Sequence, residues 1–245
     1  MRNLVVCAAV VLFTAASADA QVVNPRFFIS VNGGIQPSRG DLSDHFEFEQ
    51  HVETARVDVA YPIEQATIFD GGVAVRLWKQ LGAGVAFSGY SRDGSATVTA
   101  EIPHPFFFNR PRTIEGEVNS LTRTESAIHI QAVYIVPSSS RLRLLLSAGP
   151  SRIETEQAIV TAIQYDESFP FDTATFRGAT TRSFKASKVG FNVGVDASYM
   201  FLRNIGVGAL VRYASADIDT DGPDNRRIAL KSGGLQAGGG IRFGF

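Results

Sequence analysis

The sequence has very little cysteine, methionine or tryptophan: its 245 residues include one Cys, two Met and one Trp. The single cysteine, Cys7, lies in an apolar N-terminal stretch, so the rest of the chain can form neither a disulfide nor a thiolate nucleophile. No later apolar run approaches the roughly 20 residues that a membrane-spanning helix needs. The formal net charge of -1 gives no basic excess for nucleic acid. These absences argue against a disulfide scaffold, a helical membrane protein and a nucleic-acid-binding protein.

The first 20 residues have the features of a secretory signal peptide. Arg2 supplies the positive charge, Leu4 to Ala16 form the apolar core, and Ala18-Asp19-Ala20 matches the small-x-small cleavage pattern. This apolar core is too short to span a bilayer as a helix. We therefore expect residues 1–20 to be cleaved. Residues 21–245 contain no Pro/Gly/Ser-rich linker, so we expect them to form one domain.

What the chain does contain is alternation with a period of two, most clearly in its last eleven residues. One face of this segment carries Leu235, Ala237, Gly239, Ile241, Phe243 and Phe245, and the other carries Gln236, Gly238, Gly240, Arg242 and Gly244. Such alternation is typical of a β-strand with one apolar face. A strand that ends on an aromatic residue favours apolar side chains outside and polar ones inside, as in a transmembrane β-barrel.

The same alternation predicts seven more strands. We place the eight at residues 26–37, 67–78, 81–90, 125–136, 141–151, 188–201, 205–214 and from about 228 onward. Three connections are short and four are long, an asymmetry typical of outer-membrane barrels. The sequence therefore predicts an all-β fold: an eight-stranded antiparallel up-and-down transmembrane β-barrel with short periplasmic turns and long outer loops.

The long connections have sequence features of their own. The first, residues 38–66, contains an alternating patch at 45–59 that could extend the flanking strands. The second and third, at about 91–124 and 152–186, are also expected to be outer loops. In the second, Pro103 and Pro105 flank His104 and exclude regular strand pairing there.

The signal peptide, the eight strands, the turn asymmetry and the ending Ile241-Arg242-Phe243-Gly244-Phe245 together resemble the small eight-stranded outer-membrane β-barrels of Gram-negative bacteria. That group includes the transmembrane domain of OmpA, the OmpW barrels and the Opa-type barrels. The resemblance is one of pattern and covers the chain after the signal peptide. It implies an outer-membrane location, contact with outer-membrane lipid and lipopolysaccharide, and recognition of Phe243 and Phe245 by the barrel-assembly machinery.

Polar side chains on the inward faces of the predicted strands are candidates for an interior network. They are Asp70, Arg76, His129, Gln131, Arg143, Asn192, Asp196, Arg212, Gln236 and Arg242. An eight-stranded barrel is only wide enough for its own side chains, and buried charges need hydrogen-bonded partners. We expect a salt-bridged interior without an open pore, and the alternative is a narrow or gated conduit.

The segment Pro103 to Arg112 is the candidate contact site. Its members are His104, Phe106, Phe107, Phe108, Arg110 and Arg112. Three consecutive phenylalanines are unfavourable in water. They either pack on neighbouring loops, such as Phe169 to Phe171, or contact lipid, an apolar ligand or another protein. The arginines could meet phosphate groups.

No catalytic or metal-binding constellation is visible. Of the four histidines, His129 has Gln131 rather than a serine two positions on, and His45 and His51 with the glutamates between them could chelate a metal only weakly. We therefore predict no catalysis, no cofactor and no metal. The predicted role is structural, or an interaction at the cell surface. We expect the protein to be a monomer. The alternative is an OmpW-like conduit or binding barrel for small apolar molecules. A remote alternative is a lipid A-modifying enzyme, because barrels of this size include such enzymes.

Overall fold

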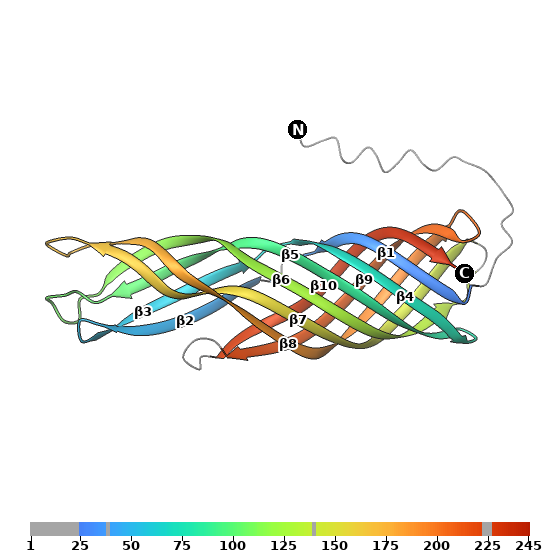
Figure 1. Cartoon of the computed structure of the whole chain (residues 1–245), viewed down its shortest axis with the longest axis horizontal. Coiled ribbons are helices and arrows are strands. Elements are labelled where there is room, and N and C mark those ends of the chain that lie inside the picture. The colour runs from blue at the N-terminus through green and yellow to red at the C-terminus, as the bar shows by residue number, and fades with distance from the viewer. Residues whose placement is uncertain (1–24, 38–39, 139–140, 222–226) are drawn as a thin grey trace, which may run out of the picture.

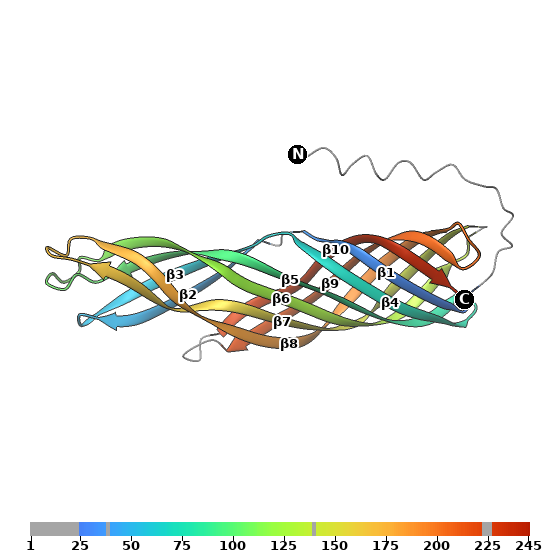
Figure 2. The same ribbon diagram turned by 45° about the horizontal axis from the view of Figure 1, so that its top comes forward.

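The computed structural model describes residues 25–37, 40–138, 141–221 and 227–245. The predicted signal peptide lies outside the described residues. The described chain forms one antiparallel sheet of ten strands, which runs along the long axis of the molecule (Figures 1 and 2). The strands are β1 (Phe27–Gln36), β2 (Gly40–Gln50), β3 (Glu53–Ile63), β4 (Ala66–Trp78), β5 (Leu81–Ile102), β6 (Arg112–Val136), β7 (Leu142–Glu167), β8 (Ala174–Met200), β9 (Ile205–Asp221) and β10 (Arg227–Gly244). No helix among the described residues is long and apolar enough to cross a membrane.

Eight of these strands close into a barrel. β1 pairs with both β4 and β10, and β5 pairs with both β4 and β6, so the ring β1-β4-β5-β6-β7-β8-β9-β10 returns to its start. At the seam, Phe28 lies opposite Gly244 and Ile35 lies opposite Ala237. Glycine is required there, because a Cβ on Gly240 would collide with the carbonyl oxygen of Val31. The predicted eight-stranded antiparallel barrel is confirmed.

The barrel carries its apolar side chains outside, as predicted. On β4, Phe69 and Val73 are 56% and 52% exposed, whereas Asp70 between them is 1% exposed. The short connections after β4, β6 and β8 lie at the same end as Pro25 and Phe245, and we call this the turn end. At the turn after β4, Lys79 adopts a positive φ of 46°, which suits a tight connection.

The segments predicted as long loops are mostly strands, so this part of the prediction is wrong. β2 and β3 form a hairpin from the first of them, and the other edge of β3 pairs with β5 rather than with β4, which follows it in sequence. β5, β6, β7 and β8 all continue past the barrel. The sheet β2-β3-β5-β6 and the β7–β8 hairpin make up the half of the molecule away from the turn end, and we call this half the extension. Strand pairing satisfies backbone groups that a long loop would leave to water.

The extension has the opposite polarity to the barrel. On β3, Ala55, Val57 and Val59 are buried, while Arg56 and Asp58 between them are exposed. The apolar cluster also includes Val98, Ile102, Ile114, Leu121, Ile153, Ile159 and Val160. Within it, the backbone N–H of Val160 donates to the hydroxyl of Tyr61 at 2.8 Å. The extension is therefore built like a soluble β-protein, with an apolar interior and a polar surface.

Candidate functional site

Two buried ion pairs form the first part of the barrel interior. The guanidinium of Arg212 donates to Asp70 at 2.5 Å, and Arg242 contacts Asp196 at 2.7 Å. Asn32 joins the two pairs, because its amide nitrogen donates to Asp70 at 2.8 Å and its oxygen accepts from Arg242 at 2.7 Å. Four of the predicted interior residues are thus brought together in one chain of charge-assisted hydrogen bonds.

A second, uncharged chain runs across the interior from β5 to β8. His129 lies 3.0 Å from the hydroxyl of Ser88 and 2.7 Å from that of Ser151. Asn192 donates to Ser151 at 2.8 Å and accepts from Gln131 at 2.7 Å. A histidine between two serines resembles a nucleophile and its base, but these three side chains are at most 2% exposed. A substrate could not reach them, so this geometry stabilises the interior.

A third polar layer separates the barrel from the extension. Arg123 donates to the Tyr90 hydroxyl at 3.2 Å and to Gln157 at 3.2 Å, and it lies 3.5 Å from Glu125. Glu125 in turn accepts the backbone N–H of Gly233 at 2.9 Å. The predicted Gln236 donates to Gln36 at 3.1 Å just below this layer. Beyond it, the interior becomes apolar.

The sequence prediction missed several members of these networks. Asn32 and Gln36 lie on the face of β1 that alternation predicts to be inward, so they could have been found. Ser88 and Ser151 are 41 and 22 positions from His129, and their contact depends on strand register that the sequence does not provide.

Two predicted members, Arg76 and Arg143, lie towards the turn end and are only half-buried. Arg76 donates to the carbonyl oxygen of Pro25 at 2.6 Å, and its guanidinium is 6.0 Å from the ring of Phe28. Arg143 lines a cavity of about 70 Å³ together with Asp196, Arg212 and Arg242. A cavity of this size holds a few water molecules rather than a drug-sized ligand.

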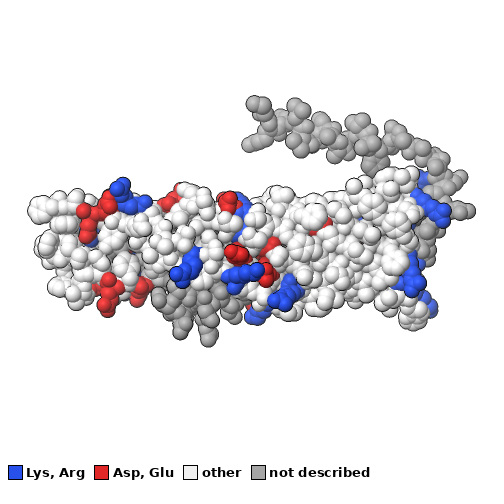
Figure 3. All heavy atoms as spheres, in the orientation of Figure 1, with Lys and Arg blue, Asp and Glu red and all other residues white. Residues whose placement is uncertain are grey.

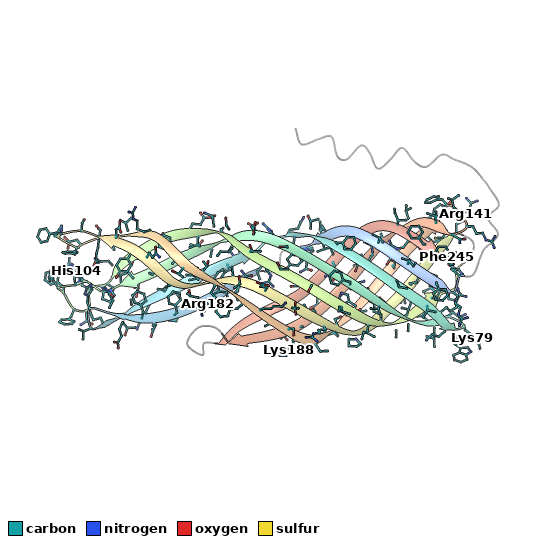
Figure 4. All side chains as sticks on the ribbon, in the orientation of Figure 1. Lys79, His104, Arg141, Arg182, Lys188 and Phe245 are labelled. Atoms are coloured by element: carbon teal, nitrogen blue, oxygen red, sulfur yellow. The ribbon has the colours of Figure 1, made fainter. Side chains whose placement is uncertain are left out.

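The aromatic tip lies at the opposite end of the molecule, where Figure 4 labels His104. It consists of four phenylalanines from the β5–β6 and β7–β8 connections: Phe106, Phe107, Phe108 and Phe169 are 66%, 53%, 72% and 84% exposed. The β2–β3 turn lies alongside, because Glu53 accepts the backbone N–H of Asn109 at 2.8 Å. The predicted packing of these loops on each other occurs through Phe106 and Phe171, whose ring centroids are 5.6 Å apart.

Two residues predicted to make contacts at the tip are structural instead. Arg112 is 6% exposed, and it donates to the carbonyl oxygens of Phe171 at 3.0 Å and Pro103 at 2.8 Å. It also lies 2.7 Å from Glu167. His104 is 3% exposed and accepts the backbone N–H of Phe106 at 3.1 Å. Arg112 holds the two loops together, because it donates to a backbone carbonyl in each of them. His104 supports the turn of its own loop by accepting a backbone N–H.

Arg110 is the predicted tip residue whose charge stays in solvent. It is exposed, and its guanidinium lies 5.5 Å from the ring centroid of Phe107. The tip therefore presents four apolar rings and one cation on a framework fixed by buried hydrogen bonds. It is a preorganised surface rather than a disordered loop.

The remaining predicted features fall elsewhere. Phe243 and Phe245 lie at the turn end, where the backbone N–H of Arg26 donates to the carbonyl oxygen of Phe245 at 2.6 Å. Their role in barrel assembly stays a prediction. His45 lies 2.9 Å from Asp58 and 3.6 Å from Glu47 on the surface of the extension. No group of three or more metal-ligating side chains occurs among the described residues.

Comparison with known proteins places this geometry in a fold group. No family model matches the sequence, and no characterised protein matches it. The outer membrane protein OprG from Pseudomonas aeruginosa matches with a TM-score of 0.52 and 10% identity, over 90% of this chain and 96% of that one. Neisserial surface protein A matches with a TM-score of 0.45 and 13% identity, over 89% and 97%. The outer membrane protease OmpT from Escherichia coli matches with a TM-score of 0.45 and 12% identity, over 94% and 100%. Identities this low bear on fold alone, and the chain has the fold of the outer-membrane β-barrels.

Proposed function

We propose that the barrel spans the outer membrane of a Gram-negative cell. The support is a continuous exposed apolar belt around the barrel, which no soluble protein of this size would leave in water. Trp78, Tyr134 and Tyr199 edge the belt near the turn end, and Tyr213 edges it near the extension. Aromatic residues at both margins of an apolar belt are typical of membrane barrels. In this orientation the turn end faces the periplasm and the extension projects outward.

The function we propose is a non-catalytic surface interaction made by the aromatic tip. The observation that carries it is the exposure of four phenylalanines at the far end of a rigid extension. The part of β5 beyond the barrel, Tyr90–Ile102, is roughly 40 Å long along the strand, so the tip lies well beyond the barrel. Apolar groups held this rigidly lose little entropy on binding, which favours contact with an apolar surface on another molecule.

The conduit hypothesis has less support. A solute that entered at the tip would have to pass the apolar cluster around Val57, Val98 and Ile159, whose side chains are fully buried. It would then meet the Arg123–Glu125 layer and the two buried ion pairs. Moving these groups apart would leave charges without partners in the interior, which is costly.

Adhesion of cells that display the protein tests the proposal. We expect binding of such cells to hydrocarbon droplets to fall at least threefold when Phe106, Phe107, Phe108 and Phe169 are all changed to Ser. The matched control changes four exposed polar residues of β8, Thr175, Thr180, Thr181 and Ser183, to Ala. It should leave binding unchanged. Equal binding by both variants would argue against a role for the tip.

Single-channel recording of the purified protein in a planar bilayer separates the two hypotheses. A closed interior predicts no openings, before or after the tip is changed. Reproducible openings that depend on Phe106 to Phe108 would support the conduit instead.

A further inference from the structure

The net charge of -1 conceals a strong separation of charge along the molecule. The described segments 40–65, 90–125, 152–188, 215–221 and 227–233, beyond the barrel, contain 20 Asp and Glu against 12 Lys and Arg. The turn end is the reverse. The described segments 25–28, 76–82, 134–138, 141–145, 199–206 and 243–245 contain six Lys and Arg and no Asp or Glu. On the face shown in Figure 3, blue residues and no red ones lie at the turn end.

The six cations of the turn end come from different parts of the chain and surround its rim. They are Arg26, Arg76, Lys79, Arg141, Arg143 and Arg203. Figure 4 shows Lys79 and Arg141 at this end, together with Phe245. Arg76 and Arg143 are half-buried at the mouth of the barrel. Because the other four lie on separate connections, their charge is distributed around the rim rather than gathered in one patch.

The rim cations lie beside the aromatic residues that edge the apolar belt. The ammonium of Lys79 is 5.1 Å from the ring of Trp78, which is 66% exposed. Arg141 donates to the hydroxyl of Tyr199 at 3.4 Å. Interfacial tryptophan and tyrosine side chains lie at the level of lipid headgroups. Lys79 and Arg141 are therefore at the depth of the phosphates of a surrounding bilayer.

We propose that this rim, formed by Arg26, Lys79, Arg141 and Arg203, binds the anionic headgroups of phospholipids in the periplasmic leaflet. A ring of separate cations next to lipid-facing aromatics suits several small phosphodiester groups better than one protein partner. Lysine and arginine near an anionic membrane surface each contribute about 1 kcal/mol, or about fivefold in affinity. The inference rests on the proposed outer-membrane location, and it is independent of the aromatic tip.

The position of Trp78 provides a direct test, because it is the one tryptophan of the chain and lies within the rim. The mature protein is inserted into phosphatidylcholine vesicles that contain an equal fraction of brominated phosphatidylglycerol or of brominated phosphatidylcholine. Bromine quenches the fluorescence of a tryptophan that it contacts. We expect the phosphatidylglycerol lipid to bind next to Trp78 about fivefold more strongly at low salt. This preference should shrink towards none in 0.5 M salt, because salt screens exposed charges. Both leaflets have the same composition, so the direction of insertion does not affect the result.

The variant Lys79→Gln removes the cation beside Trp78 and should lose most of the preference that this probe detects. The matched control, Arg182→Gln, removes one positive charge from the surface of the extension and should keep it. The variant Arg26→Gln, Arg141→Gln, Arg203→Gln leaves Lys79 in place, so it should keep the preference next to Trp78.

Three outcomes would count against the proposal in different ways. Equal quenching by the two lipids in the unmodified protein at low salt would overturn the rim site alone. A preference that survives in the Lys79→Gln variant would also overturn it. Quenching by neither lipid would overturn membrane insertion, and with it the proposed location.

Discussion

The barrel and the extension share four strands and one alternating pattern, yet they use the pattern in opposite senses. On β5, Val85 in the barrel is 55% exposed, whereas Val98 in the extension is 0% exposed. The barrel interior contains paired charges, amides and hydroxyls beside a few apolar side chains such as Leu210, whereas the extension interior consists mainly of aliphatic side chains. Between the two lies the layer of Arg123, Glu125 and Gln157. The difference shows that polarity can invert along a continuous strand when a polar layer separates the two environments.

This inversion accounts for the main error in the sequence prediction. A period of two identifies a strand but does not say which face points inward. In the barrel, the exposed apolar side chains indicate a surface that contacts lipid, because so many apolar side chains would be unfavourable in water. In the extension, the same alternation at residues such as Val57 and Val59 indicates a water-exposed sheet with an apolar core. The polar faces of the strands distinguish the barrel from the extension, because Asp and Glu are abundant in the extension and nearly absent from the barrel.

The change with the largest expected effect tests the apolar core of the extension. Val57→Asp places a carboxyl group among aliphatic side chains that offer it no partner, at a cost of roughly 5 kcal/mol. We expect the extension to become sensitive to protease while the barrel stays folded and keeps its shifted mobility on an unheated gel. The same change at Val73, on the outer face of the barrel, should instead reduce insertion into vesicles. If Val57→Asp also abolished the mobility shift, the two halves would be one cooperative unit.

The next largest effect comes from the charged interior of the barrel. Asp70→Ala leaves Arg212 buried without its carboxylate and should destabilise the barrel by about 3–5 kcal/mol. The urea concentration at which the gel-mobility shift is lost measures this. The double change Asp70→Leu, Arg212→Met removes both charges and should cost much less, because no unpaired charge remains. Equal losses from both variants would mean that the ion pair itself, rather than the isolated charge, determines stability.

The fold of the barrel could be predicted because each of its strands shows alternating apolar and polar residues in the sequence. The segments around Val193 and Val207 alternate without interruption, and short turns such as Lys79-Gln80 fix their order. The hairpin β2–β3 was only partly visible. Its alternation could be seen, but its pairing with β5, as in Arg56 opposite Glu101, connects residues far apart in the chain. Register of that kind is decided by packing and not by local pattern.

The candidate sites were predictable to a different degree. Every second residue along a strand of the barrel points inward, so Asp70, Asp196 and Arg212 could be assigned to the interior from their positions in the sequence. Which acid meets which arginine depends on register around the ring. At the tip, composition identified the phenylalanines, but it could not distinguish Arg110, which remains in solvent, from Arg112, which is buried under the loops. The charge of the rim was hidden, because a net charge near zero does not show where the charges lie.

A smaller, local effect is expected where the extension supports the tip. Arg112→Ala removes the donors for the carbonyl oxygens of Pro103 and Phe171 and should cost about 1–3 kcal/mol of local stability. Hydrogen exchange should accelerate in residues 103–111 and 168–173 and stay unchanged in the barrel. Arg110→Ala is the matched control, because its guanidinium is exposed and lies only against Phe107. Faster exchange in both variants would mean that the tip is held by its aromatic contacts.

The smallest effect should come from an exposed ion pair on the surface of the extension. Lys185 lies 2.7 Å from Glu154, and the hydrogen bond from this carboxylate, with its charge, raises the pKa of Lys185 above its ordinary value of 10.5. A raised pKa in the folded protein means that the pair stabilises the fold below pH 10.5 and that this contribution is lost as the pH rises through the folded-state pKa. Glu154→Gln should therefore bring the pKa of Lys185 back down, which an NMR titration of the labelled ammonium group would detect. The urea midpoint at pH 7 should stay unchanged within error, because water screens a pair on the surface. A clear loss of stability at pH 7 would mean that this surface ion pair, and not only the buried apolar side chains, stabilises the extension.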